Sequence, residues 1–212
     1  MDRRAALRNI GLSAGFIAVT PTLISLMQSC SKKEYMMDWT PELLTADEAK
    51  ALDQIVDLII PETDIPGAKA LHVPMLIDKY ATHVASAEEA GMFKTGAGMI
   101  LVELGVNEDK PVDEVTTEAY DALLAKYLKL PKEKQMEYRN QMYAPEALEN
   151  PESIPQEVIV FNFLASIRDL TILGYKSTEY IGENVLAYQP VPGEQIGCAP
   201  VNTLTGGKAW SL

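Results

Sequence analysis

The chain has 212 residues, with 18 basic and 30 acidic side chains that give a formal net charge of −12. Hydrophobic residues make up 47% and charged residues 23%, a balance typical of a globular chain and not of a disordered one. The length suits one ordinary domain and a targeting segment. Because so acidic a surface repels nucleic acid and anionic lipid headgroups, the composition argues against nucleic-acid binding and against a basic membrane-binding face.

The first 29 residues have the layout of an export signal. Arg3 and Arg4 precede Leu7, and an apolar stretch follows from Ile10 to Met27. Paired arginines before an apolar stretch are typical of the twin-arginine signal, a route that carries folded proteins. The alternative is a permanent transmembrane anchor, which Pro21 and the small polar residues of the stretch disfavour.

Cys30 follows the apolar stretch at the position of the lipidated cysteine of bacterial lipoproteins. The competing interpretation is a disulfide with Cys198, the other cysteine of the chain. We predict a twin-arginine-type lipoprotein signal peptide over residues 1–29 and a polar tether over 30–41. Cleavage removes three arginines and one aspartate, so the net charge changes from −12 to −14. The expected product is an exported, periplasmic lipoprotein held on a membrane of the bacterial envelope by its acyl chains.

Residues 42–212 are predicted to form a single all-α domain of five or six helices with an extended Pro/Gly-rich C-terminal arm. Thr45 and Glu48 have the spacing of a capping box, and the apolar stripe that follows ends at Pro61. The other expected helices cover Val73–Ala87, Ala90–Leu104, a segment from Thr116 or Thr117 to Leu128, Lys132–Met142 and Gln156–Tyr175. Strand signals are nearly absent.

The sequence contains no phosphate-binding loop, haem-attachment motif or zinc-protease motif. Gly96-Ala97-Gly98 lacks the context of a dinucleotide-binding loop and is interpreted as a small-residue patch that permits close helix packing. His72 and His83 would lie about 16 Å apart along a helix, too far to share a metal ion. We therefore predict no catalytic residue, no metal site and no cofactor bound by this chain.

Two segments interrupt the helical pattern and are the candidate partner-binding regions. The first, residues 61–68, also suits a plain linker between helices. The second runs from Arg168 to Cys198, and its Gly, Pro and Tyr residues cannot build a core, so it must lie on the helices or on a partner. The candidate residues are Pro61, Thr63, Asp64, Pro66, Gly67, Gly174, Tyr175, Ser177, Gly182, Tyr188, Pro192, Gly193 and Cys198.

At these segments the chain resembles the gluconate 2-dehydrogenase subunit 3 family, the small subunits of membrane-associated flavin-dependent sugar and polyol dehydrogenases. The resemblance covers roughly residues 42–200, a span over which both interrupting segments occur in order. It is carried by Leu44-Thr45, Ile60–Ala68, Val73-Pro74, Gly174–Gly182, Tyr188, Pro192-Gly193 and Gly197-Cys198. Lys176 departs from the family pattern, which has an aromatic residue there, and Ser177-Thr178 reverses its hydroxyl pair.

The resemblance implies a non-catalytic subunit with a large partner, an FAD-containing oxidoreductase of the glucose-methanol-choline type that oxidises the sugar. In many such systems a cytochrome c subunit passes the electrons onward. The small subunit is implied to support export and maturation of the flavoprotein and to stay bound to it, and a lipidated Cys30 would anchor both. Two alternatives remain: a free-standing envelope lipoprotein that acts as a binding module, and an enzyme that acts alone.

Overall fold

In the computed structural model, the described residues are 37–191, 193–194 and 197–211. The predicted signal residues Arg3, Arg4 and Leu7, the predicted lipidation site Cys30, and Pro192 lie outside these ranges. The all-α prediction is confirmed, because the elements within the described ranges are helices. The α-helices are α2 (Ala46–Ile59), α3 (Val73–His83), α4 (Ala87–Glu103), α5 (Thr117–Leu128), α6 (Lys132–Met142), α7 (Pro145–Glu149), α8 (Gln156–Lys176) and α9 (Val201–Thr205).

Helix α2 begins and ends where the sequence predicts. The Thr45 hydroxyl accepts from the Glu48 N–H at 3.3 Å, and the Glu48 carboxylate accepts from the Thr45 N–H at 2.8 Å. This capping box satisfies two backbone donors that a helix start leaves without partners. The apolar stripe is buried, with Ile55 and Val56 1% and 0% exposed. Local sequence signals therefore account for this helix.

The predicted boundary between the second and third helices is wrong. Helix α3 ends at His83, and α4 begins directly after Ser86. The reason is a second capping box, in which the Ser86 hydroxyl accepts from the Glu89 N–H and the Glu89 carboxylate accepts from the Ser86 N–H. The pair has the same spacing as Thr45 and Glu48, so the signal was present in the sequence.

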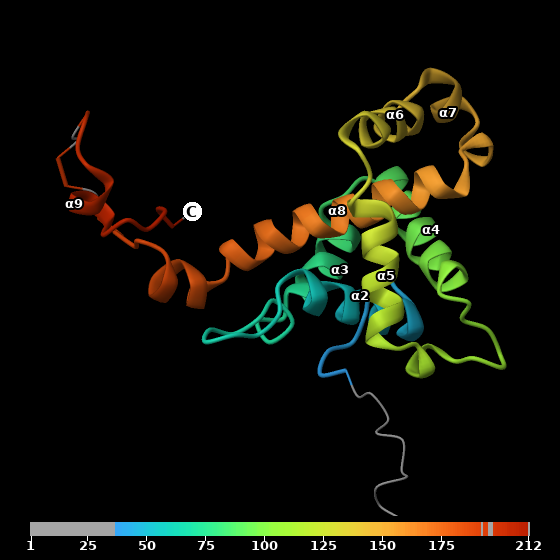
Figure 1. Ribbon diagram of the computed structural model, residues 1–212, viewed down its shortest axis with the longest axis horizontal. Helices are drawn as coiled ribbons and strands as arrows, with labels where there is room; N and C mark the ends of the chain where they lie inside the picture. Colours follow the sequence, from blue (N-terminus) through green and yellow to red (C-terminus); the bar gives the residue numbers. More distant parts are fainter. Residues whose placement is uncertain (1–36, 192, 195–196, 212) are drawn as a thin grey trace, which may run out of the picture. The chain divides into compact units, whose positions relative to one another are not determined.

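Helix α8 forms the centre of the helical body, defined here as residues 37–176. It packs against α2, α3, α4, α5 and α6, and Figure 1 shows it lying across these shorter helices. By length and composition α8 could cross a membrane, with a mean hydropathy of 1.4 over its most apolar window. However, 56% of that window is buried inside the domain. Burial on so many sides accounts for its apolar composition as that of a core helix.

The small residues of α4 permit its close contact with α8. A Cβ atom at Gly96 would lie 2.6–2.7 Å from side-chain atoms of Phe163, a distance that real Cβ contacts essentially never show. Ala97 beside it is 4% exposed. The interpretation of this stretch as a packing patch is therefore confirmed for Gly96 and Ala97.

The later helices agree with the prediction and add short elements to it. Thr116 caps α5 through the Ala119 N–H, and α6 covers the predicted Lys132–Met142. The additional elements are α7, α9, two 3₁₀ turns at Val112–Glu114 and Pro151–Ser153, and a π-helix at Ile181–Val185. Each is only three to five residues long. Elements this short have no complete apolar stripe for the sequence to reveal.

The two ends of the C-terminal arm, the described residues within 186–211, are bonded to each other. The Ala187 N–H donates to the Ala209 carbonyl at 2.8 Å, and the Ser211 N–H donates to the Ala187 carbonyl at 2.9 Å. Between these ends lies α9, which stops at Gly206 in a left-handed conformation with φ 65°. The described part of the arm thus has paired ends and one short helix, where the sequence predicted an extended segment.

Candidate partner-binding site

The structure brings the two interrupting segments together. The Tyr175 hydroxyl donates a hydrogen bond to the Pro66 carbonyl at 2.9 Å, across 109 positions of sequence. A Cβ atom at Gly174 would lie 3.2 Å from side chains of both Val73 and Leu76, so the end of α8 lies close against the start of α3. We call residues 60–68 together with 174–175 the motif junction.

Gly67 allows the first segment of the junction to turn back on itself. The Ala68 N–H donates to the Ile60 carbonyl at 2.9 Å, and this bond closes the loop. A Cβ atom at Gly67 would lie 2.6–2.9 Å from backbone atoms of residues 60–62, where no side chain fits. Pro61, Thr63 and Asp64 stay exposed at the surface of this loop. The loop is therefore a closed turn at the surface, held by a backbone hydrogen bond.

The second segment of the junction is the last turn of α8. Burial, and to a lesser extent the neighbouring Tyr180, raise the pKa of Tyr175, so its hydroxyl remains a donor at neutral pH. The Ser177 hydroxyl donates to the Leu173 carbonyl at 2.9 Å, which satisfies a carbonyl at the helix end. Ser177 thus stabilises the end of α8 while its side chain stays exposed at the surface.

The remaining candidate residues do not join the motif junction. Gly182 is buried beside the end of the arm, where an added Cβ would lie 2.9 Å from the Ser211 hydroxyl. Tyr188, Gly193 and Cys198 lie on the arm and are exposed, and Cys198 forms no disulfide with any residue that the structure describes. Their proposed contact with a partner stays a prediction.

The arm exposes large apolar side chains. They are Tyr188, Val191, Val201, Leu204 and Trp210, with exposed fractions of 50%, 79%, 61%, 40% and 48%. Single exposed apolar residues are normal on proteins, but a whole segment of them is typical of a surface that binds a partner.

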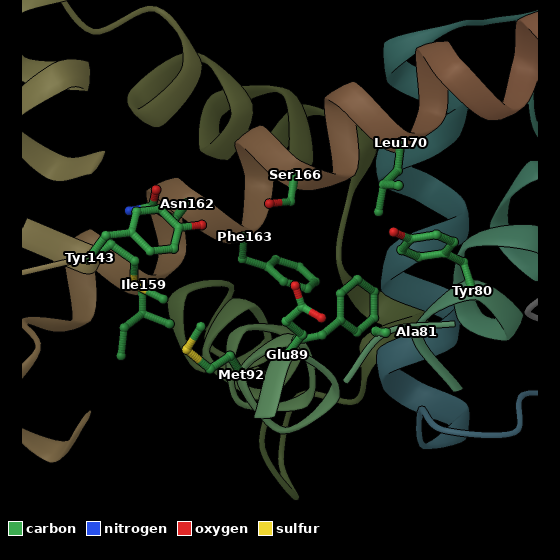
Figure 2. A pocket seen from close by; sticks show the side chains of 13 residues that line it. Tyr80, Ala81, Glu89, Met92, Tyr143, Ile159, Asn162, Phe163, Ser166 and Leu170 are labelled. Atoms are coloured by element: carbon green, nitrogen blue, oxygen red, sulfur yellow. The ribbon is translucent and has the colours of Figure 1, made fainter. Parts of the chain in front are cut away.

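A groove opens on the helical body between α3, α4 and α8, next to the end of α6 (Figure 2). Its volume is about 180 Å³. Its apolar wall includes Phe93 and Phe163, whose ring centroids are 5.1 Å apart. Figure 2 shows Tyr80 and Tyr143 on opposite sides, with Glu89 between them. We call this feature the α3–α8 groove.

Two buried carboxylates that the sequence analysis missed hold the segment before α2. Asp78 is 1% exposed and accepts from the backbone N–H groups of Glu42, Leu43 and Leu44 at 2.6, 3.3 and 3.1 Å. Asp53 is also 1% exposed and accepts from the Trp39 indole N–H at 3.0 Å. An aspartate within an apolar helix stripe was the available signal, since buried carboxylates need such partners.

Trp39 lies within the predicted 30–41 tether and is only 8% exposed, so packing of the domain begins before residue 42. Both histidines also face this segment: His72 Nδ1 lies 3.4 Å from Asp38, and His83 Nε2 lies 2.6 Å from Glu42. Across the described ranges, no three His, Cys, Asp or Glu side chains form a group suited to a metal ion. The histidines thus support the attachment of residues 38–44 to α3.

Comparison with known proteins decides the family. The family model of gluconate 2-dehydrogenase subunit 3 matches residues 46–193, well over half of the chain. The chain belongs to this family. No curated protein and no solved structure matches it. As a gluconate 2-dehydrogenase subunit 3 protein, it is a subunit of a gluconate 2-dehydrogenase-like complex, and the match includes both halves of the motif junction.

Proposed function

We propose that the chain is the non-catalytic small subunit of a flavin-dependent sugar or polyol dehydrogenase. Its partner would be an FAD-containing subunit of the glucose-methanol-choline type, and this chain itself would bind no cofactor. Family membership supports the complex, and the exposed apolar side chains of the C-terminal arm are the structural observation that carries the proposal. An apolar surface of this kind is exposed to solvent in the free subunit and would be buried when the partner binds.

The same subunit would export and anchor the flavoprotein. Arg3 and Arg4 would direct the folded pair to the twin-arginine route, and Cys30 would carry the lipid on the periplasmic side. With a net charge of −14 after cleavage, the domain gains nothing from anionic headgroups, so attachment would rest on the acyl chains. A cytochrome c subunit could then complete the path for electrons.

The first test is a pull-down of the tagged full-length protein from membranes in gentle detergent. Flavin absorbance and mass spectrometry of the eluate identify what is bound. We expect an FAD oxidoreductase in stoichiometric amount. A colourless, solitary lipoprotein would contradict the proposal and favour the free-standing binding module.

The carrier role has a separate test in the signal. The double change Arg3→Lys and Arg4→Lys should leave both this chain and the flavoprotein in the cytoplasm, because the twin-arginine route requires the arginine pair. Arg8→Lys is the matched control, since it makes the same change outside the pair. Fractionation and flavoenzyme assays report the outcome. A flavoprotein that still reaches the envelope would show that this chain does not carry it.

A further inference from the structure

The α3–α8 groove has the size of a side-chain pocket. Its volume of about 180 Å³ is below the roughly 300–1,000 Å³ of typical cofactor and small-molecule sites. Aromatic and sulfur-containing side chains form much of its wall, among them Met92, Phe93 and Phe163. A groove of this kind accepts large apolar side chains from a partner helix, as in other helix-in-groove complexes.

The groove carries negative charge. Among its described lining residues, Glu89 is the one with a charged side chain. The Ser86 backbone N–H, followed by the Ser86 hydroxyl, lowers the pKa of Glu89, so the carboxylate stays ionised at neutral pH. Tyr80 and Tyr143 stand on either side of it (Figure 2). An ionised carboxylate between aromatic rings favours a lysine or arginine, whose stem packs on the rings.

The groove continues toward the motif junction along the contact between α3 and α8. Tyr80 and Leu170 line it. One turn further on, Leu76 and Leu173 are 42% and 56% exposed, and Leu76 also packs against Gly174 of the junction. The apolar surface thus runs from the groove to the junction.

We propose that the α3–α8 groove binds an amphipathic, basic segment of the catalytic subunit. The segment inserts apolar side chains beside Phe93 and Phe163 and places a lysine or arginine at Glu89. This inference rests on the proposed function and adds a second contact, on the helical body, to that of the arm. Charge complementarity selects the partner over a second copy of this acidic chain.

The test compares the flavoprotein retained by full-length variants in the same detergent pull-down. Ser166→Arg places a bulky cation into the groove from an exposed position on α8, and we expect at least about tenfold less flavoprotein. Glu89→Gln preserves the capping box but removes the charge. It should weaken retention about two- to fivefold and make it less sensitive to salt. Glu88→Gln, one residue away and outside the lining, is the matched control.

The outcomes separate this inference from the proposed function. If the unchanged protein retains no flavoprotein, the proposed function fails. If the unchanged protein retains the flavoprotein, and both groove variants retain as much of it as the control does, the proposed function stands and the groove inference is wrong. A dimer of the unchanged protein that Ser166→Arg dissociates would also overturn it, because a second copy would then cover the groove. If Ser166→Arg lowers the Tm, its loss of flavoprotein could come from misfolding. The retention of flavoprotein by Glu89→Gln, and the salt dependence of that retention, then test the groove inference.

Discussion

The core of the helical body and the C-terminal arm differ in the exposure of their apolar side chains. In the body, Ile77 and Leu164 are 0% exposed, whereas Val191 and Val201 of the arm are 79% and 61% exposed. Burying such a side chain fully contributes about 1.5–3 kcal/mol. Burial of such side chains stabilises the body, whereas the exposed side chains of the arm contribute little to folding. The difference indicates that the core of the body provides the stability of the domain, whereas the arm presents apolar side chains that the fold does not use.

The largest effect in this comparison should come from Asp78 of the body. Asp78→Ala leaves three backbone N–H groups without their acceptor, so we expect a loss of about 3 kcal/mol in the free energy of unfolding. Denaturant titration measures it. The control is Lys79→Ala, which changes the exposed neighbour on the same helix and should change stability by less than about 0.5 kcal/mol. Equal effects of the two changes would show that the bonds to Asp78 contribute little.

The next effect separates buried from exposed positions within one helix. Gly96→Ala forces a methyl group against Phe163 and should cost about 1–3 kcal/mol. Gly91→Ala on the same α4 meets nothing within 4 Å, so its higher helix propensity should add about 0.5–1 kcal/mol. Thermal unfolding of the pair should therefore show Tm shifts of opposite sign. A stabilising Gly96→Ala would mean that α4 and α8 can move apart at no cost.

A third effect depends on pH. Burial, then the charges of Asp113 and Asp47, raise the pKa of Tyr120 to about 12, and its hydroxyl has no hydrogen-bond partner among the described residues. Because the unfolded chain ionises near pH 10, the contribution of Tyr120 is complete below that pH and is lost as the pH rises toward 12. Tyr120→Phe should lose less stability between pH 9 and 11.5 than the unchanged protein, measured by denaturant midpoints. Parallel declines would contradict this assignment.

The smallest effect on stability should come from the arm. Removal of residues 187–212 takes away side chains of which the described ones are mostly exposed and none is buried, so the free energy of unfolding should change by less than about 0.5 kcal/mol. The same truncation should markedly reduce the flavoprotein retained in the pull-down. If the truncated protein unfolds more easily by several kcal/mol, the arm belongs to the body and the comparison above is wrong.

Sequence analysis predicted those features that local signals specify. The capping box of Thr45 and Glu48 fixed the start of α2, and the length of α8 followed from its apolar residues. The same rule would have placed the start of α4, had the Ser86 and Glu89 pair been recognised. The spacing of apolar residues therefore predicted which segments are helical. The wrong boundary between α3 and α4 came from the capping box at Ser86, which the prediction did not include.

The candidate site depends on contacts between distant residues, which spacing does not contain. Tyr175 reaches Pro66 only because α8 crosses the start of α3, and the groove exists only where α3, α4 and α8 meet. The family resemblance indicated both halves of the motif junction but not that they touch. The position of Asp78 within an apolar stripe could have indicated a buried carboxylate, but not its partners, because these are backbone groups of a distant segment.

The attachment of residues 37–44 also determines how the domain would respond to a mechanical pull on its N-terminal end. Tension along the chain would reach the bond from Trp39 to Asp53 of α2, and then the three bonds to Asp78 in the middle of α3, before it reached the first turn of α2. Load would thus be divided between two helices of the core. Under such a pull, the side-chain bonds of Asp53 and Asp78 would have to break before the backbone bonds of α2 carried the load.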